Sequence, residues 1–240
     1  MPPIARLHLI TPNRTDRSVV DRSQHALDAG ARWLQVRTKD ATDRARLDLA
    51  TELVACTAAH GAVALVDDRV DIALATRAHG VHVGADDLPV AIARALLGPK
   101  AIIGATCRNA DDARAAFEAG ASYVGVGPVF ETTTKIGLPD PIGLSGLHAV
   151  ASACPIPVIA ISGITVARVP MVLEAGAHGV AVVDAVFGAP DVADAVAAFL
   201  DALGGEDLDG SVVPGAGAAA RSEEHEPAVP AAAQPIGLAP

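Results

Sequence analysis

Short apolar runs recur along the chain, and each of them ends in polar or glycine residues. They cover residues 7–11, 33–37, 62–67, 80–84, 101–106, 123–127, 157–162 and 179–184. Val, Ile, Leu and Ala follow one another in these runs instead of alternating with polar residues, which is typical of parallel strands buried on both faces. The pattern therefore predicts eight parallel strands.

The segments between these runs have the period of helices. Leu47, Ala50, Val54 and Ala58 recur at helical spacing, and Gly61 closes that segment. An Ala-Gly-Ala repeat at 29–31, 119–121 and 175–177 comes directly before three of the predicted strands. Glycine in this repeat can take the left-handed conformation that ends a helix, so each repeat indicates a helix end that leads into a strand.

Eight alternating strand and helix units either close into a barrel or form an open, doubly wound sheet. We favour a single α/β domain, a (β/α)₈ TIM barrel over residues 1–203. The first turn lacks the GxGxxG phosphate motif of an open nucleotide-binding sheet, and eight strands are the number that closes a barrel. The open sheet remains the alternative.

Residues 204–240 differ from the rest of the chain because they are rich in Gly, Ala and Pro and show no hydrophobic period. This stretch holds six acidic residues and one basic residue. Such a composition buries too little apolar surface to offset the entropy lost on ordering, so we expect a disordered acidic tail.

Composition excludes several classes of function. Aromatic residues make up only 2% of the chain and the net charge is -10, which argues against a nucleic-acid partner but allows a local site for small anions. Three cysteines about fifty residues apart indicate neither a disulfide framework nor a zinc site. No run reaches the ~20 apolar residues of a membrane helix, and no targeting signal is evident. We expect a cytoplasmic protein without a membrane partner, and a homo-oligomer remains open.

The second apolar run ends in a set of polar side chains on one face. In a (β/α)₈ barrel the active site lies at the carboxyl ends of the strands. Period two puts Gln35, Arg37 and Lys39 on the same side of this strand end. An amide, a guanidinium and an ammonium that converge there would suit a polyanionic ligand.

Carboxylates follow the third and fourth runs. Asp67 and Asp68 end the third, and Asp86 and Asp87 follow the fourth. Mg²⁺ takes one or two carboxylates and completes its ligand set with water and substrate phosphates, so Asp68 and Asp87 are candidate metal ligands. Both also stand where a helix N-cap is expected, and the spacing favours neither interpretation.

Two later loops are candidates for a second anion site. The loop at 127–135 carries three threonines and Lys135, and the seventh run ends in Ser162 and Gly163 before another helix. Hydroxyls and an ammonium can bind phosphate oxygens. Loops after strands seven and eight commonly form a phosphate site in such barrels. The sequence thus indicates two anion sites, one near strands two to four and one near strands six to eight.

The same segments resemble the thiamine-phosphate synthase family, also called thiamine-phosphate pyrophosphorylases. The matching stretches are QVRTK at 35–39, DDRVD at 67–71, GVHVGADDLP at 80–89, GPVFETTTK at 127–135 and ISGI at 161–164. They occur in the family's order along roughly residues 6 to 203. The ordered set, above all the 127–135 loop, is specific.

The resemblance implies a transferase of thiamine biosynthesis that joins a pyrimidine diphosphate to a thiazole phosphate with release of pyrophosphate. It implies that pyrophosphate leaves first and that the thiazole nitrogen captures the pyrimidine methyl cation. Two phosphorylated small molecules would then be the substrates and Mg²⁺ the cofactor. The residues it implicates are Gln35, Arg37 and Lys39 for the pyrimidine diphosphate, Asp68 and Asp87 for Mg²⁺, Thr106 near the pyrimidine, Thr132 and Thr134 for the thiazole phosphate, Lys135 for pyrophosphate, and Gly163 and Val183 for the thiazole phosphate cradle.

Three positions depart from the family pattern. Asp67 stands where an asparagine is usual, Ser162 replaces a common glycine, and Asp184 lies where a small residue such as serine is expected beside the phosphate. An ionised Asp184 that faces the phosphate would repel it. Alternatively, Asp184 turns away and caps the last helix.

Two other functions remain open at this point. A thiazole tautomerase shares the fold and much of the loop at 127–135, but carries a histidine where this chain has Pro128. A catalytically silent barrel that binds thiamine-pathway phosphates is the second alternative. The carboxylates at both candidate metal positions argue against it.

Overall fold

The computed structural model describes residues 2–132 and 137–205. Strands alternate with helices along these residues. The strands are β1 (Leu7–Ile10), β2 (Trp33–Val36), β3 (Val63–Asp67), β4 (Gly80–Val83), β5 (Ile102–Cys107), β6 (Tyr123–Val126), β7 (Val158–Ile161) and β8 (Gly179–Val182). The helices are α1 (Arg17–Asp28), α2 (Asp43–Ala59), α3 (Val70–Thr76), α4 (Val90–Leu97), α5 (Ala110–Glu118), α6 (Gly143–Ala153), η1 (Val166–Arg168), α7 (Val169–Glu174), α8 (Asp184–Phe187) and α9 (Val192–Ala202).

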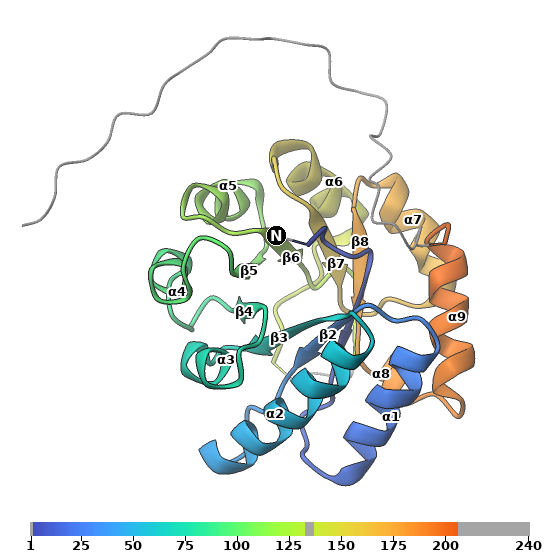
Figure 1. Ribbon diagram of the computed structural model, residues 1–240. Coiled ribbons are helices and arrows are strands. Elements are labelled where there is room, and N and C mark those ends of the chain that lie inside the picture. Colours follow the sequence, from blue (N-terminus) through green and yellow to red (C-terminus); the bar gives the residue numbers. More distant parts are fainter. Residues whose placement is uncertain (1, 133–136, 206–240) are drawn as a thin grey trace, which may run out of the picture. The chain divides into compact units, whose positions relative to one another are not determined.

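The strands form a closed parallel barrel. Each strand pairs with the next along the chain, and β8 pairs with β1 through Leu7 and Val180. Figure 1 shows the strands in the centre, with the helices around them. The predicted TIM barrel is confirmed, because closure rules out the open sheet. Each predicted run matches a strand to within two residues at either end.

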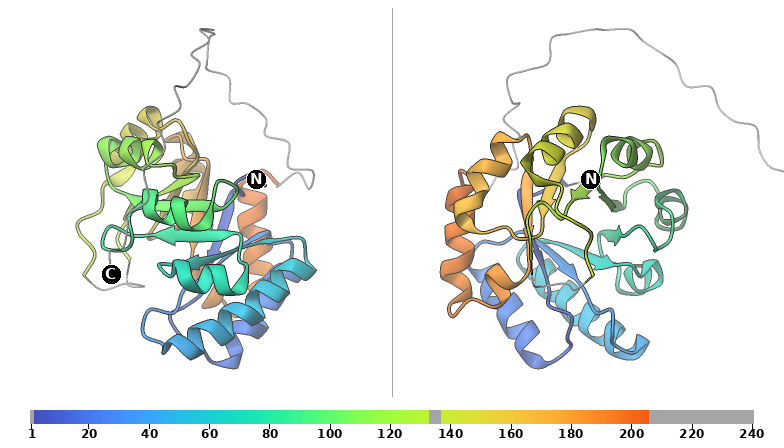
Figure 2. Two further views of the ribbon diagram at one scale, coloured as in Figure 1. Left: turned by 60° about the vertical axis from the view of Figure 1, so that its left-hand side comes forward. Right: turned by 180° about the vertical axis from the view of Figure 1, so that it is seen from behind.

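In every strand except β4, alternate residues belong to two separate cores. Leu9 and Leu34 join the layer between the strands and the helices, whereas Ile10 and Trp33 join a cluster inside the barrel. This separation follows from the period of two in a strand. The side view in Figure 2 shows the helices outside the strands. The inner cluster is Ile10, Trp33, Val63, Leu65, Ile102, Tyr123, Ile159 and Ala181.

The three Ala-Gly-Ala repeats end helices as predicted. Gly30, Gly120 and Gly176 have φ of 104°, 94° and 96°. In each repeat, the N–H of the last alanine donates to a carbonyl five residues earlier, as Ala31 does to Ala26. These bonds satisfy carbonyls that the helix end leaves free and turn the chain directly into the next strand.

Helix α2 forms where it is predicted, but its buried face differs from the predicted stripe. Ala50 is buried, whereas Leu47 and Val54 are only half-buried and Ala58 is exposed. Helical period shows which residues share a face, but apolar residues occur on more than one face of α2. Packing against the barrel decides which of these faces is buried. The buried residues of α2 are Leu49, Ala50, Leu53 and Thr57.

The predicted tail lies almost entirely outside the described residues, which end at 205, so the boundary between 203 and 204 stays a prediction. Among the described residues, no helix is long and apolar enough to cross a membrane.

Candidate active site

A cavity of about 630 Å³ lies at the carboxyl ends of the strands. The described residues that were predicted for the site all line it: Gln35, Arg37, Lys39, Asp67, Asp68, Asp87, Thr106, Thr132, Gly163, Val183 and Asp184. Thr134 and Lys135 lie outside the described residues. The barrel brings these side chains together because all parallel strands end at one rim.

Asp67 lies at the centre of the polar set on β2 and β3. Gln35 Nε2 donates to Asp67 Oδ1 at 2.6 Å, and Arg37 Nε is 3.7 Å from Asp67 Oδ2. Lys39 Nζ is 3.8 Å from the same oxygen, which has no hydrogen-bond partner among the described residues. Burial raises the pKa of Asp67, while the charges of Lys39 and Arg37 oppose this rise.

Asp68 and Asp87 face each other across the ends of β3 and β4. A hydrogen bond joins their side chains, and Lys39 Nζ lies 2.6 Å from Asp68 Oδ2. Burial, the bond to Asp87 and the charge of Asp67 raise the pKa of Asp68 to about 7. Burial acts in the same direction on Asp87, but its bonds to Asp68 and to the Gly84 N–H leave the pKa lowered overall.

Neither of these aspartates caps a helix, so the capping interpretation is wrong. Helix α3 has Arg69 at its N-cap and α4 has Pro89, and neither N-cap makes a side-chain hydrogen bond to the helix. Asp68 has a φ of 62°, which turns the chain away from a capping geometry. Asp87 Oδ2 accepts from the Gly84 N–H at 2.7 Å instead.

The raised pKa of Asp68 predicts how stability depends on pH. The folded protein favours the protonated form of Asp68. The contribution of this group to the free energy of unfolding is fully present below its unfolded pKa of about 4 and is lost as the pH rises through about 7. An asparagine cannot ionise, so Asp68→Asn should gain about 2 kcal/mol relative to the wild type between about pH 5 and about pH 8. Urea unfolding of both proteins in metal-free buffer at both pH values measures this, and a constant difference would contradict it.

Two neutral histidines occupy the inner wall of the cavity. His8 stacks on Trp33 at 4.3 Å between ring centroids, and burial lowers its pKa well below the usual value. Burial also lowers the pKa of His82 to about 4. Its Nδ1 lies 3.0 Å from the Tyr123 hydroxyl and its Nε2 lies 3.0 Å from Thr106 Oγ1. A neutral ring donates from one nitrogen and accepts at the other, so His82 orients the Thr106 hydroxyl.

The opposite wall is a tight turn after β7. Ser162 and Gly163 both have positive φ, 77° and 67°. Glycine adopts positive φ without strain, which explains why the family pattern has a glycine at the position of Ser162. A Cβ at Gly163 would lie 2.5 Å from the Glu131 carbonyl oxygen. Arg168 Nη1 donates to the Gly163 carbonyl at 2.6 Å, and its guanidinium lies 4.3 Å from the centre of the Phe130 ring. The turn is thereby fixed against the loop after β6.

Asp184 is the first residue of α8 and lines the cavity. The last helix, α9, is capped by the Asp191 side chain, which accepts from the N–H groups of Ala193 and Asp194. The alternative in which Asp184 caps the last helix is therefore wrong. Asp184 belongs to the part of the cavity wall that follows β8.

The sequence interpretation did not assign a role to His8, His82, Tyr123 or Arg108, all of which line the cavity. The signal for Arg108 was present, because it stands two residues after Thr106 and so shares its face. The signal for the others was weak. A single histidine or tyrosine inside an apolar strand fits a core position as well as a position in a binding site.

Six aspartates and three non-histidine basic side chains are among the described residues that line the cavity. No group of three or more His, Cys, Asp or Glu among the described residues could hold a metal ion by itself. A polyanionic ligand would therefore need cations in addition to these basic side chains.

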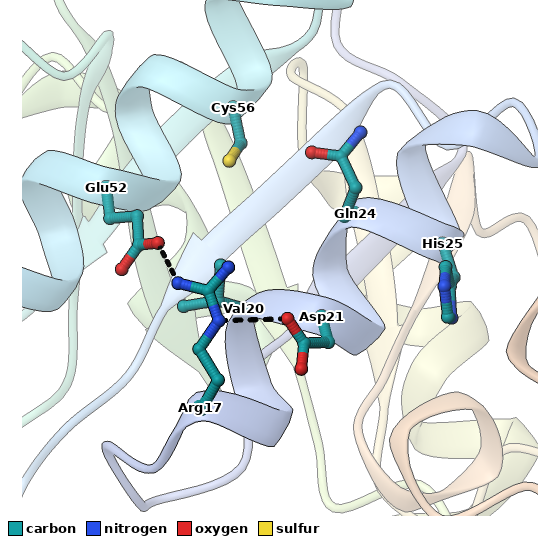
Figure 3. Close-up of a pocket in the computed structure, with 7 residues that line it drawn as sticks. All are labelled: Arg17, Val20, Asp21, Gln24, His25, Glu52 and Cys56. Carbon is teal, nitrogen blue, oxygen red and sulfur yellow. Dashed lines mark hydrogen bonds and ion pairs between the residues drawn. The ribbon is translucent and has the colours of Figure 1, made fainter.

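A second hollow lies on the outside of the barrel, between α1 and α2, and has a volume of about 350 Å³. Figure 3 shows that Arg17 spans it and is bound to Asp21 and Glu52. Burial raises the pKa of the Cys56 thiol, which makes it a poor nucleophile. None of the predicted site residues lies there.

Comparison with known proteins gives one consistent result. A family model described as thiamine monophosphate synthase matches residues 7–186. The thiamine-phosphate synthase of Salinispora arenicola is 52% identical over 206 residues, which are 85% of this chain and 99% of that protein. That of Salinibacter ruber is 45% identical over 84% of this chain and 90% of its own length. A solved thiamine phosphate pyrophosphorylase from Pyrococcus furiosus has a TM-score of 0.75 and 37% identity, and covers 83% of this chain and 95% of that one.

Proposed function

Because the chain belongs to the thiamine monophosphate synthase family and is a transferase of thiamine biosynthesis, we propose how its residues carry out the reaction. It joins an aminopyrimidine methyl diphosphate to a methylthiazole ethyl phosphate, and the products are thiamine phosphate and pyrophosphate. One cavity lined by two walls of different chemistry supports this reaction, because each wall suits one of the two anions.

The pyrimidine diphosphate binds along β2, β3 and β4. Arg37 and Lys39 contact its diphosphate, and Gln35 and Asp67 lie deeper, at the ring. The Gln35 amide is held by Asp67, so its remaining donor and acceptor point to a fixed place. Thr106, oriented by His82, offers a hydroxyl to the pyrimidine.

The contact between Asp68 and Asp87 fits a Mg²⁺ site. Two carboxylates this close share a proton unless a cation lies between them, and Mg²⁺ uses one or two carboxylates plus substrate phosphate oxygens. Asp68 and Asp87 would hold the ion, which when bound supplies charge that stabilises the leaving pyrophosphate. Lys39 beside Asp68 adds a positive charge at the same place.

The thiazole phosphate binds at the turn after β7 and the end of β8. Gly163 lines the cavity and its close approach to Glu131 fixes the turn, while Val183 adds backbone directly after β8. Thr132, and by the family pattern Thr134, contribute hydroxyls on this side.

The reaction begins when the bond between the pyrimidine methylene carbon and the diphosphate oxygen breaks, and its electron pair leaves with pyrophosphate. Arg37, Lys39 and Lys135 stabilise the charge that develops on that oxygen. The lone pair of the thiazole nitrogen then forms the new bond to the methylene carbon. His8 and His82 are neutral, so they add no positive charge beside the cation.

A direct assay tests the activity. The full chain is incubated with both substrates and Mg²⁺, and thiamine phosphate and pyrophosphate are measured together. Equal amounts of the two products are expected. Conversion of a thiazole isomer without pyrophosphate would favour a tautomerase, although Pro128 stands where that enzyme has histidine. Binding of both substrates without turnover would indicate a silent barrel.

The chain's three cysteines are free thiols in the structure. This agrees with the proposal that the protein works in the reducing cytoplasm.

Asp184 should weaken binding of the thiazole phosphate, because its carboxylate lies on the same wall as that phosphate. Asp184→Ser is expected to lower the KM for the thiazole phosphate about 3- to 10-fold, since one like charge is removed from a partly desolvated site. The KM for the pyrimidine diphosphate should stay fixed. Steady-state kinetics with each substrate varied in turn separates these constants, and a change confined to the pyrimidine side would contradict the placement.

A further inference from the structure

Arg108 follows β5 and lines the cavity, yet none of the roles above uses it. Its Nη2 donates to the carbonyl oxygen of Asp140 at 2.8 Å. Its Nη1 is buried and has no hydrogen-bond partner among the described residues. A buried guanidinium nitrogen without a partner costs free energy, so such a group calls for a ligand or another explanation.

The other two Lys and Arg side chains that line the cavity within the described residues are already paired with carboxylates. Arg37 lies near Asp67, and Lys39 contacts Asp68. Within residues 2–132 and 137–205, no carboxylate lies within 4.0 Å of the Arg108 guanidinium. The positive charge of Arg108 is thus available to an anion in the cavity.

One acidic side chain close to Arg108 in the sequence is bound in another way. Asp112 also lines the cavity, but its Oδ2 accepts from the main-chain N–H of Arg108 at 3.2 Å. The hydrogen bond to the Asp140 carbonyl fixes Nη2 of the Arg108 guanidinium, and Nη1 remains without a partner among the described residues. Such a fork is well suited to phosphate oxygens, because its donors are planar and set in advance.

The position of Arg108 in the barrel decides which anion it meets. It follows β5, which pairs with β4, and Asp87 lies in the loop that follows β4. The thiazole phosphate wall is formed by the ends of β7 and β8 and by Thr132 from the loop after β6. Thr106, two residues before Arg108 and on the same face, is proposed to contact the pyrimidine, which carries the diphosphate. The pyrophosphate side is therefore the closer one.

We propose that Arg108 is a further substrate-binding residue, whose guanidinium holds the pyrophosphate group of the pyrimidine substrate and of the product. The bond from Nη2 to Asp140 orients the guanidinium for this contact. The assignment of the anion as pyrophosphate rests on the proposed function.

Binding of inorganic pyrophosphate in the presence of Mg²⁺, measured by calorimetry, tests the proposal without turnover. Arg108→Gln should weaken pyrophosphate binding about 10- to 100-fold, because a charge-assisted hydrogen bond is lost. Binding of the thiazole phosphate alone should change less than about threefold. Arg114→Gln is the matched control, since Arg114 lies on the exposed face of α5 and pairs with Asp111. Its pyrophosphate affinity should equal that of the wild type.

A folded Arg108→Gln protein with wild-type pyrophosphate affinity would overturn the proposal. Equal loss of affinity for both anions would also overturn it, since it would show that Arg108 only fixes the segment around Asp140. If the glutamine variant does not fold, Arg108→Lys replaces it. Lysine keeps the charge without the fork, so about fivefold weaker binding is expected and unchanged affinity would refute the role of the fork.

The proposed activity can fail independently of this result. A wild-type protein that binds pyrophosphate through Arg108 but forms no thiamine phosphate would refute the function and keep the anion site. If the wild type forms thiamine phosphate and the Arg108→Gln variant binds pyrophosphate as tightly as the wild type, the function is kept and the role of Arg108 is refuted.

Discussion

Replacement of Asp68 or Asp87 by asparagine should lower turnover at least about 100-fold, which is the largest effect we expect. The two carboxylates contact each other, and neither serves a helix cap. Their proximity has a chemical use if a cation binds between them. Asparagine keeps the shape of the side chain and removes a negative charge, so the loss would reflect the cation site.

The folds of these variants should be intact. Asparagine tolerates the positive φ of Asp68 better than most residues, and its amide can still bond to Asp87. Asp111→Asn is the control, because Asp111 is exposed on α5, outside the cavity. Turnover is measured over a range of Mg²⁺ concentrations with circular dichroism as the check of folding. Wild-type rates in both variants, or in excess chelator, would refute the assignment.

Lys39→Met should lower kcat/KM for the pyrimidine diphosphate about 100-fold. The ammonium lies 2.6 Å from Asp68 and 3.8 Å from Asp67, where we propose that the leaving pyrophosphate gathers charge. Burial lowers the pKa of Lys39, but the hydrogen bond to Asp68 and the charges of Asp67, Asp68 and Asp87 raise it overall. The side chain therefore stays protonated during the reaction.

Methionine has a similar length and apolar stem, so it removes the charge with little change in packing. Lys39→Arg should recover part of the activity, and Lys100→Met, at an exposed position, should change nothing. The KM for the thiazole phosphate should stay within about threefold in all three proteins, since we propose that this anion binds at the other wall. A loss shared by both substrates, or full activity in Lys39→Met, would contradict the role.

Much of the fold follows from local pattern. Near-continuous apolar runs mark strands that are buried on both faces, so 33–37 and 80–84 predict β2 and β4 almost to the residue. The Ala-Gly-Ala repeats mark helix ends because only glycine takes the positive φ there without strain. The composition of the candidate site follows as well, since Arg37 and Lys39 must share the face of Gln35.

Other features needed contacts between segments that are distant in the sequence. From its spacing in the sequence, Asp68 can be either a helix cap or a metal ligand. Its contact with Asp87 exists only because β3 and β4 end side by side. The stripe of α2 that faces the barrel is selected by packing among several apolar positions. The roles of Thr134 and Lys135 stay predictions from the sequence.

The sequence by itself determined the eight strands and the residues at the strand ends, because strand period and glycine geometry are properties of a few neighbouring residues. It favoured a barrel over an open sheet, and closure in the structure decided between the two. Only the tertiary structure decided that Asp184 lines the cavity while Asp191 caps α9, that His82 joins Tyr123 to Thr106, and that Arg108 Nη1 is buried without a partner among the described residues. The physical reason is that burial, shifted pKa values and missing hydrogen-bond partners depend on the atoms that closure of the barrel brings around each side chain.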